Sequence, residues 1–107
     1  MREQRLIDRL KANWGDKADA LDCYAEIKYY DPLSSWCCYV FAMDEYEETI
    51  SVLLYSNALG AEITKMNVED LSYMYNENGE PPVIDGEFRR KKVTEILKRY
   101  KNDTRRD

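Results

Sequence analysis

Apolar residues recur at helical spacing near the start of the chain. The stretch "REQRLIDRLKANW" carries apolar side chains three or four positions apart, at Leu6, Ile7, Leu10 and Trp14. This spacing predicts an amphipathic helix over residues 2–14. Gly15 would end the helix, because glycine readily adopts the left-handed conformation found at helix C-termini. A polar link, "DKADALD", follows.

Two contrasting strand patterns come next. In "CYAEIKYY", residues 23–30, apolar and polar side chains alternate, which predicts a half-buried strand with Glu26 on its wetter face. In "WCCYVFAM", residues 36–43, the apolar run does not alternate, as expected of a central strand covered on both faces. The intervening "DPLSS" predicts a turn, since Pro32 fixes one backbone angle and Asp31 can accept local hydrogen bonds.

Predicted turns and helix caps divide the rest of the chain into strands and helices. "DEYEE" and "NALG" are turns, and they separate the strand patterns "TISVLLYS" and "AEITKM". Asn67 is expected to cap a short helix that "NENGEPP" ends, with apolar positions Val68, Leu71, Met74 and Tyr75. Asp85 is expected to cap a basic amphipathic helix whose apolar stripe comprises Phe88, Val93, Ile96, Leu97 and Tyr100.

The length of 107 residues allows one modest core and is too short for two. We therefore predict a single α+β domain with an N-terminal helix, an antiparallel meander of about four strands, a short helix and a basic C-terminal helix. Its parts are the helix and link (1–22), the sheet (23–66), the C-terminal helices (67–101) and a frayed tail (102–107). With neither a signal-peptide pattern nor an apolar run of roughly 20 residues, we expect a cytoplasmic protein without membrane contact.

Charge is distributed unevenly along the chain. The formal net charge is −5; nine basic and three acidic residues from Arg89 onward give +6, so the rest of the chain carries −11. An acidic body repels nucleic-acid phosphate and is suited to a basic protein surface. Direct nucleic-acid binding would therefore depend on the C-terminal element.

The sequence contains few patterns of residues that could carry out catalysis or bind a metal. Cys37 and Cys38 are adjacent on a predicted strand and would point to opposite faces, and the chain has no histidine to join them or Cys23. We expect buried structural thiols. The familiar phosphate-loop, dinucleotide, hydrolase, zinc-protease and deaminase motifs do not occur, so we expect no cofactor, no metal and no catalytic residue.

Two charged segments and an aromatic group are candidates for binding. The turn Asp44, Glu45, Glu47 and Glu48 could contact a basic partner, while the alternatives are a solvated turn and a metal site. The aromatic group could form a partner surface, a ligand pocket or simply core; it comprises Tyr24, Tyr29, Tyr30, Trp36 and Tyr39. The run Arg89, Arg90, Lys91 and Lys92 is placed in the first turns of the last helix, where cations oppose the helix dipole, which suggests phosphate or acidic-partner contact unless the acidic body pairs with it.

Three stretches carry a family resemblance. "IKYYDPLSSWCCYV" is similar to a pattern of lysine, two aromatics, Asp-Pro, a small residue and Trp, at Lys28, Tyr29, Tyr30, Asp31, Pro32, Ser35 and Trp36, with a later aromatic at Tyr39. Glu62 followed by "NVEDL", and the spacing of Pro81, Asp85 and Phe88, complete it. Over residues 23–97 the chain resembles Domain of Unknown Function 2958, carried on bacterial plasmids, conjugative elements and phages. Thr64, Lys65 and Glu87 depart from the family's usual residues, and the resemblance implies a setting rather than an activity.

These observations favour a binding protein over an enzyme. The first hypothesis is an inhibitor of a host defence nuclease, of the anti-CRISPR or anti-restriction type, whose partner surface comprises Tyr30, Asp31, Trp36 and the acidic turn. The second is a regulatory protein that contacts nucleic acid through residues 89–92. The third is a small-ligand or metal-dependent enzyme, which would need a concave pocket at Tyr30, Asp31 and Trp36. The sequence leaves self-association open.

Overall fold

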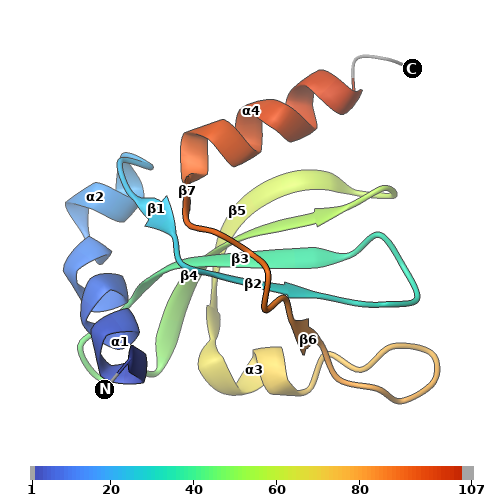
Figure 1. Cartoon of the computed structure of the whole chain (residues 1–107), viewed down its shortest axis with the longest axis horizontal. Coiled ribbons are helices and arrows are strands. Elements are labelled where there is room, and N and C mark those ends of the chain that lie inside the picture. The colour runs from blue at the N-terminus through green and yellow to red at the C-terminus, as the bar shows by residue number, and fades with distance from the viewer. Residues whose placement is uncertain (1, 105–107) are drawn as a thin grey trace.

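The structure is a computed structural model that describes residues 2–104, with the side chains of residues 4–101. Its elements follow the predicted order of helix, sheet and helices and confirm the α+β class (Figure 1). They are α1 (Arg2–Asn13), α2 (Asp16–Asp19), β1 (Tyr24–Ala25), β2 (Ile27–Tyr30), β3 (Cys37–Met43), β4 (Thr49–Ser56), β5 (Gly60–Asn67), α3 (Val68–Ser72), β6 (Val83–Ile84), β7 (Lys91–Lys92) and α4 (Val93–Thr104).

The main sheet has five antiparallel strands in the order β5-β4-β3-β2-β6, and β1 pairs separately with β7. The meander from β2 to β5 was predicted. The fifth strand, β6, was not predicted, because two exposed residues that follow a pair of prolines carry no strand pattern of their own. β5 forms one edge of the sheet and would offer its free side to any self-association.

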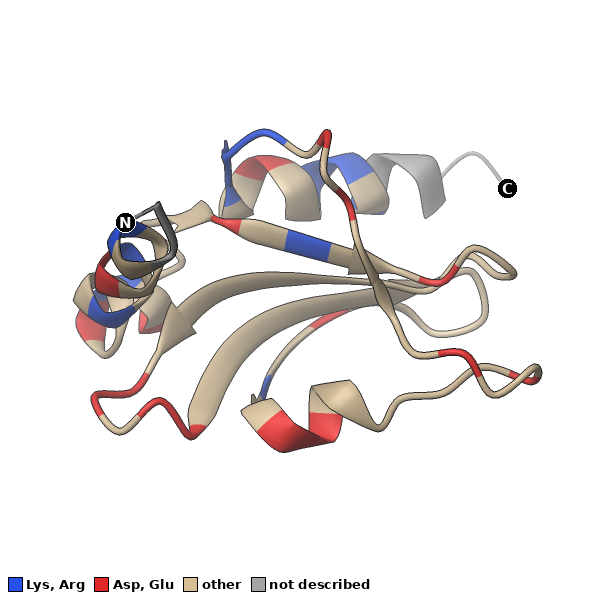
Figure 2. Cartoon of the chain, turned by 60° about the horizontal axis from the view of Figure 1, so that its bottom comes forward, with Lys and Arg blue, Asp and Glu red and all other residues tan. Residues whose placement is uncertain are grey.

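Helices cover both faces of the sheet (Figure 2). On one face α4 packs through Val93 and Ile96 against β3 and β4, in a core that includes Phe41 and Leu53. On the other face α1 and α3 contribute Leu10 and Leu71, which pack against the opposite sides of the same strands. β3 therefore contributes side chains to both cores, which lie on opposite faces of the sheet.

β3 is covered on both faces as predicted, and a bulge adjusts its alternation. Val40 pairs with Val52 and Ala42 pairs with Ser51, which leaves Phe41 as the extra residue. The bulge turns both Phe41 and Ala42 into the α4-side core, whereas Val40 points to the other core. The Phe41 carbonyl accepts a hydrogen bond of 2.9 Å from Asn13 Nδ2, which ties α1 to the bulge.

The first predicted strand is broken at Glu26. Ala25 packs in the α4-side core and Ile27 in the opposite core, so the side-chain alternation reverses between β1 and β2. The prediction that Glu26 faces the wetter side is wrong, since its side chain is 1% exposed. Arg9 Nε and Arg90 Nε each lie 2.9 Å from its Oε1, and these two guanidinium groups make burial of the carboxylate tolerable.

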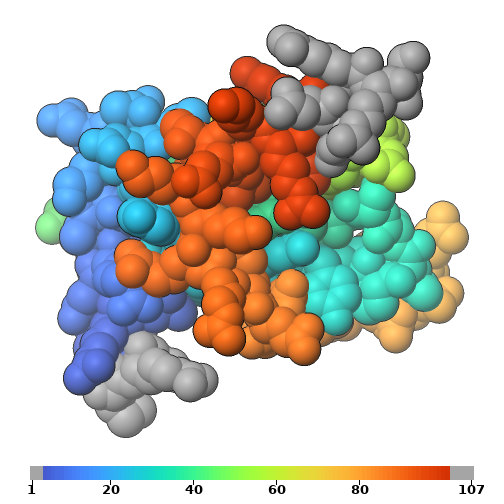
Figure 3. Space-filling view, turned by 45° about the horizontal axis from the view of Figure 1, so that its top comes forward, coloured from blue at the N-terminus to red at the C-terminus, as the bar shows by residue number. Residues whose placement is uncertain are grey.

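Residues 85–92 are a surface strap and not the first turns of a helix. Asp85 Oδ1 accepts the backbone N–H of Glu87 at 2.9 Å, but α4 begins only at Val93. The intervening residues run past the N-terminal helices (Figure 3), and the last two of them, Lys91 and Lys92, pair with β1. The predicted cap and the predicted conflict between the basic run and a helix dipole are therefore wrong, because the run is extended.

Four further features of the helices differ from the predictions. The polar link contains the short helix α2, after Gly15 with its φ of 93°. Asn67 precedes α3 but its side chain makes no capping hydrogen bond. α3 ends at Ser72, so Met74 and Tyr75 are exposed and not part of a helical stripe. α4 continues to Thr104 through the start of the predicted frayed tail, whose last residues, 105–107, lie outside the described part of the chain.

α1 and α4, the longest helices among residues 2–104, have 12 residues each. Within that part of the chain, no helix combines the length and apolar character required to cross a bilayer.

Candidate functional site

The acidic turn between β3 and β4 is held by its own first residue. Asp44 Oδ1 accepts the backbone N–H groups of Glu48 at 2.8 Å and Thr49 at 3.1 Å. Glu47 has a φ of 59°, a left-handed conformation that glycine or asparagine adopts at lower cost. The backbone of the turn therefore does not require a glutamate at position 47.

The acidic turn lies beside the start of α3. The Val68 N–H donates to the Glu48 carbonyl at 2.8 Å, which joins the turn to the helix directly. A hollow of about 350 Å³ lies between them and is lined by Glu47, Glu48, Thr49, Asn67, Val68 and Glu69. Two chain segments 20 residues apart thus bring their carboxylates to one place.

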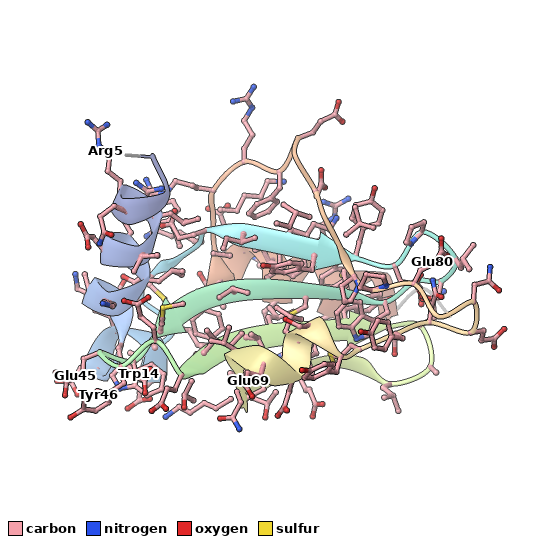
Figure 4. The ribbon with its side chains drawn as sticks, turned by 90° about the horizontal axis from the view of Figure 1, so that it is seen from below. Arg5, Trp14, Glu45, Tyr46, Glu69 and Glu80 are labelled. Atoms are coloured by element: carbon pink, nitrogen blue, oxygen red, sulfur yellow. The ribbon has the colours of Figure 1, made fainter. Side chains whose placement is uncertain are left out.

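We use the term α3 face for the acidic surface formed by this turn, α3 and the loop after it. Its carboxylates are Asp44, Glu45, Glu47, Glu48, Glu69, Asp70, Glu77 and Glu80. Figure 2 shows red segments along the β3–β4 turn, α3 and the loop after it, and Figure 4 shows Glu45 at one end, Glu69 in the middle and Glu80 at the other end. Among the described side chains the one ion pair on this face joins Lys11 Nζ to Glu47 Oε2 at 2.7 Å.

Exposed aromatic residues accompany these carboxylates. Tyr46 is 72% exposed in the acidic turn, and Tyr73 and Tyr75 are 68% and 56% exposed just after α3. Tyrosine is enriched where proteins bind one another because it offers a large apolar ring with a polar end. The sequence patterns did not indicate Glu69, Asp70 or these three tyrosines as binding residues. The available signal was the acid-flanked stretch "SYMY", of which Met74 and Tyr75 are expected from the sequence to belong to a helical apolar stripe.

The predicted partner surface is divided by β3. Trp36 precedes this strand and the acidic turn follows it, so the seven residues of β3 lie between the two halves of the prediction. Seven strand residues span roughly 23 Å. The structure therefore joins the acidic turn to α3 and places Tyr30, Asp31 and Trp36 at the opposite end of the sheet.

Asp31 has a structural role at that far end. Its carboxylate accepts the Leu33 N–H at 3.0 Å, the Ser34 hydroxyl at 2.8 Å and Asn76 Nδ2 at 2.9 Å. The hydrogen bond from Asn76, followed by those from Leu33 and Ser34, lowers the pKa of Asp31. These bonds fix the β2–β3 turn and attach the loop after α3 to it.

A groove of about 440 Å³ is present beside Tyr30, Asp31 and Trp36, as the small-ligand alternative requires. Tyr55 and Tyr100 stack along it with ring centroids 3.9 Å apart, and Lys28 Nζ lies 3.9 Å from Asp85 Oδ2. In the described part of the chain, no group of three or more cysteine or carboxylate side chains is placed to hold a metal ion. The groove could accommodate a small ligand, but its lining does not indicate a particular reaction.

The five aromatic candidates do not form a single stacking surface. Tyr30 and Tyr39 pack on the α4 side of the sheet, whereas Tyr29 and Trp36 pack on the opposite side. Tyr24 lies on β1, with the Arg90 guanidinium 4.8 Å from its ring centroid. Most of this group belongs to the two cores, as the core interpretation expected.

The three cysteines are buried free thiols. Cys37 and Cys38 belong to opposite cores, which confirms that adjacent strand positions separate them. Burial raises the pKa of Cys38 to about 12, and burial followed by the nearby Asp22 raises the pKa of Cys23. Both shifts favour the thiol over the reactive thiolate.

A buried hydroxyl cluster makes stability depend on alkaline pH. The Tyr39 and Tyr100 hydroxyls lie 2.6 Å apart, and Tyr100 OH lies 3.3 Å from Cys37 Sγ. Burial raises the pKa of Tyr39 from 10.0 to about 12 and also raises that of Tyr100.

We expect the free energy of unfolding to be constant up to about pH 8 and then to fall as the pH rises toward about 12. The unfolded chain ionises first, because its thiols and phenols keep their ordinary pKa values. For each group that is ionised in the unfolded chain but still protonated in the folded protein, the free energy of unfolding falls by about 1.4 kcal/mol per pH unit. Urea titrations at about pH 8 and pH 11 would measure this loss. Tyr39→Phe should reduce the slope, and Tyr46→Phe, on an exposed ring, should not; equal stability at both pH values would contradict the expectation.

Comparisons of the chain with protein-family models, with curated proteins and with solved structures found no match. The proposal of a function therefore depends on the geometry and charge of the molecule and on the resemblance suggested by its sequence.

Proposed function

We propose that this chain is a non-enzymatic binding protein whose α3 face docks on a basic surface of another protein. The observation that supports this proposal is the combination, on one face, of eight carboxylates with the exposed rings of Tyr46, Tyr73 and Tyr75. Carboxylates steer the encounter with a basic partner, and tyrosine rings supply apolar area that can be buried on contact. Solvation alone would account for the charges but not for the exposed rings beside them.

Glu47 adds to this argument. A glutamate in the left-handed conformation costs about 1 kcal/mol relative to glycine. Its ion pair with Lys11 is exposed and offsets only part of that cost. A charged side chain kept at such a position is consistent with a use in binding.

The proposed partner is inferred from the charge of the α3 face and, in addition, from the sequence resemblance to Domain of Unknown Function 2958, for which no family model matched the chain. Nucleases that hold nucleic acid do so in basic grooves, and an acidic face can occupy such a groove in place of the phosphates. On a bacterial mobile element the natural target of that kind is a host defence nuclease. We therefore propose an inhibitor of the anti-CRISPR or anti-restriction type.

The test is capture of a nuclease from bacterial extract by the tagged protein at low and moderate salt, with mass spectrometry and a cleavage assay of the captured complex. Glu48→Lys with Glu69→Lys should reduce capture and inhibition at least tenfold, because two attractions become repulsions. The matched control is Glu87→Lys with Glu95→Lys, which changes the net charge equally on exposed positions near α4.

A further variant separates binding from folding. Glu47→Asn removes a charge at a position whose backbone favours asparagine, so it should weaken capture while leaving the melting temperature unchanged or higher. Equal losses for the α3-face pair and the control pair would contradict the proposed surface. A captured nuclease that cleaves normally would contradict inhibition.

A second candidate is a regulatory protein that contacts nucleic acid through the strap. Arg89, Lys91 and Lys92 are exposed, although Arg90 is engaged with Glu26. Retention of nucleic acid alone, with a steep salt dependence that Lys91→Glu with Arg89→Glu abolishes, would favour this candidate.

A further inference from the structure

A basic recess lies between the N-terminal helices and the strap. It has a volume of about 480 Å³, and its principal lining side chains are Arg9, Lys17, Tyr24, Glu26, Arg90 and Lys92. They come from α1, α2, the β1–β2 segment and the strap, which lies against the blue N-terminal region in Figure 3. We call this cavity the basic recess.

The basic recess has a positive net charge, whereas the molecule as a whole is negatively charged. Four cations line it, whereas Asp22 and Glu26 contribute two negative charges, so its net formal charge is +2. Outside residues 89–107 the chain carries −11. A local excess of positive charge in so acidic a body creates a potential that attracts anions to one place.

Glu26 holds the two arginines side by side. Arg9 Nε lies 2.9 Å from its Oε1, and Arg90 Nε lies 2.9 Å from the same oxygen and 3.0 Å from Oε2. The two arginine side chains are about half exposed, and each guanidinium carries Nη donors in addition to the bonded Nε. A buried carboxylate that orients two guanidiniums preorganises donors for an oxyanion.

The lysine residues of the recess contribute to the fold through their backbone, and not through ion pairs of their side chains. Lys17 and Lys92 are exposed, and among the described side chains neither forms an ion pair. Ion pairing with Glu26 therefore explains the presence of the two arginines, but no ion pair in the described part of the chain explains the presence of the two lysines. A doubly charged anion would balance the net charge of +2.

We propose that the basic recess binds a small phosphate monoester, held by Arg9, Arg90, Lys17 and Lys92. Arginine forks and lysine ammonium groups together recognise the oxygens of a phosphate dianion. A volume of about 480 Å³ exceeds what bare phosphate fills. The ring of Tyr24 has the Arg90 guanidinium 4.8 Å from its centroid but is still partly exposed, and this exposed part offers apolar area to the organic group. A recess lined by four chain segments, in an acidic body, favours a small ligand over a nucleic-acid strand.

The test is calorimetric titration of the full chain with inorganic phosphate, with adenosine monophosphate as the monoester probe, and with a short single-stranded oligodeoxynucleotide. Adenosine monophosphate should bind more tightly than inorganic phosphate. It should also bind more tightly than the oligonucleotide when the oligonucleotide concentration is expressed per nucleotide. Lys17→Gln with Lys92→Gln should weaken monoester binding at least tenfold, since two charge-assisted contacts are removed without disturbing Glu26.

The matched control is Lys91→Gln with Lys98→Gln, which removes two exposed lysines outside the basic recess. It should change monoester affinity by no more than about twofold, because it alters only the distant field. Equal weakening by both pairs would overturn the proposal in favour of nonspecific attraction. Binding of the oligonucleotide alone would assign the recess to nucleic acid, and no binding of any probe at low salt would also overturn it.

Discussion

Replacing Glu26 with glutamine is expected to lower the free energy of unfolding by about 2 to 3 kcal/mol. The Glu26 side chain is 1% exposed and accepts donors from Arg9 and Arg90. Glutamine has the same shape but no charge, so both guanidiniums would lose their charged acceptor and would repel each other. They are about half exposed, and partial rehydration keeps the cost below that of a fully buried pair.

Urea unfolding of the Glu26→Gln variant would measure this loss directly. Glu45→Gln is the control, because Glu45 is exposed in the acidic turn and should change stability by less than about 0.5 kcal/mol. A loss of the same small size for Glu26→Gln would contradict the view that this carboxylate joins α1 and the strap to the sheet.

Phe41→Ala is expected to have a still larger effect, a loss of about 3 to 5 kcal/mol. Phe41 is 0% exposed and is among the largest fully buried side chains of the core beneath α4. It is the extra residue of the β3 bulge, whose carbonyl is held by Asn13, so the backbone cannot easily close around the cavity. Small domains have a total stability of about 5 to 15 kcal/mol, so much of the margin would be lost.

Thermal and urea unfolding would test this expectation. Leu59→Ala provides the control truncation, since Leu59 is 86% exposed and its loss should cost little. Phe41→Leu should fall between the two, because it keeps most of the buried apolar volume. A cost below about 1 kcal/mol for Phe41→Ala would mean that the bulge relaxes to fill the space.

The two proposed binding surfaces carry opposite charges and lie on different parts of one small domain. The α3 face gathers carboxylates beside exposed tyrosines, and the basic recess gathers cations between the N-terminal helices and the strap. Variants of Glu48 and Glu69 should therefore leave monoester binding unchanged, just as variants of Lys17 and Lys92 should leave partner capture unchanged.

Local sequence patterns by themselves determined the α+β class and most of its elements. The helix that begins the chain, the Asp-Pro turn and the strands β3, β4 and β5 were predicted because each follows from spacing within a few residues. The burial of Cys37 and Cys38 in opposite cores followed from strand alternation in the same way.

Only the tertiary structure decided what the charged residues do. Glu26 belongs to an alternating pattern that indicates exposure, yet two arginines from distant segments bury it. The run at residues 89–92 has helix-forming residues, yet pairing with β1 makes it extended. The acidic turn was visible in the sequence, but its junction with α3 was not. Contacts between distant segments depend on packing and strand register across the whole domain, and local spacing carries no signal for them.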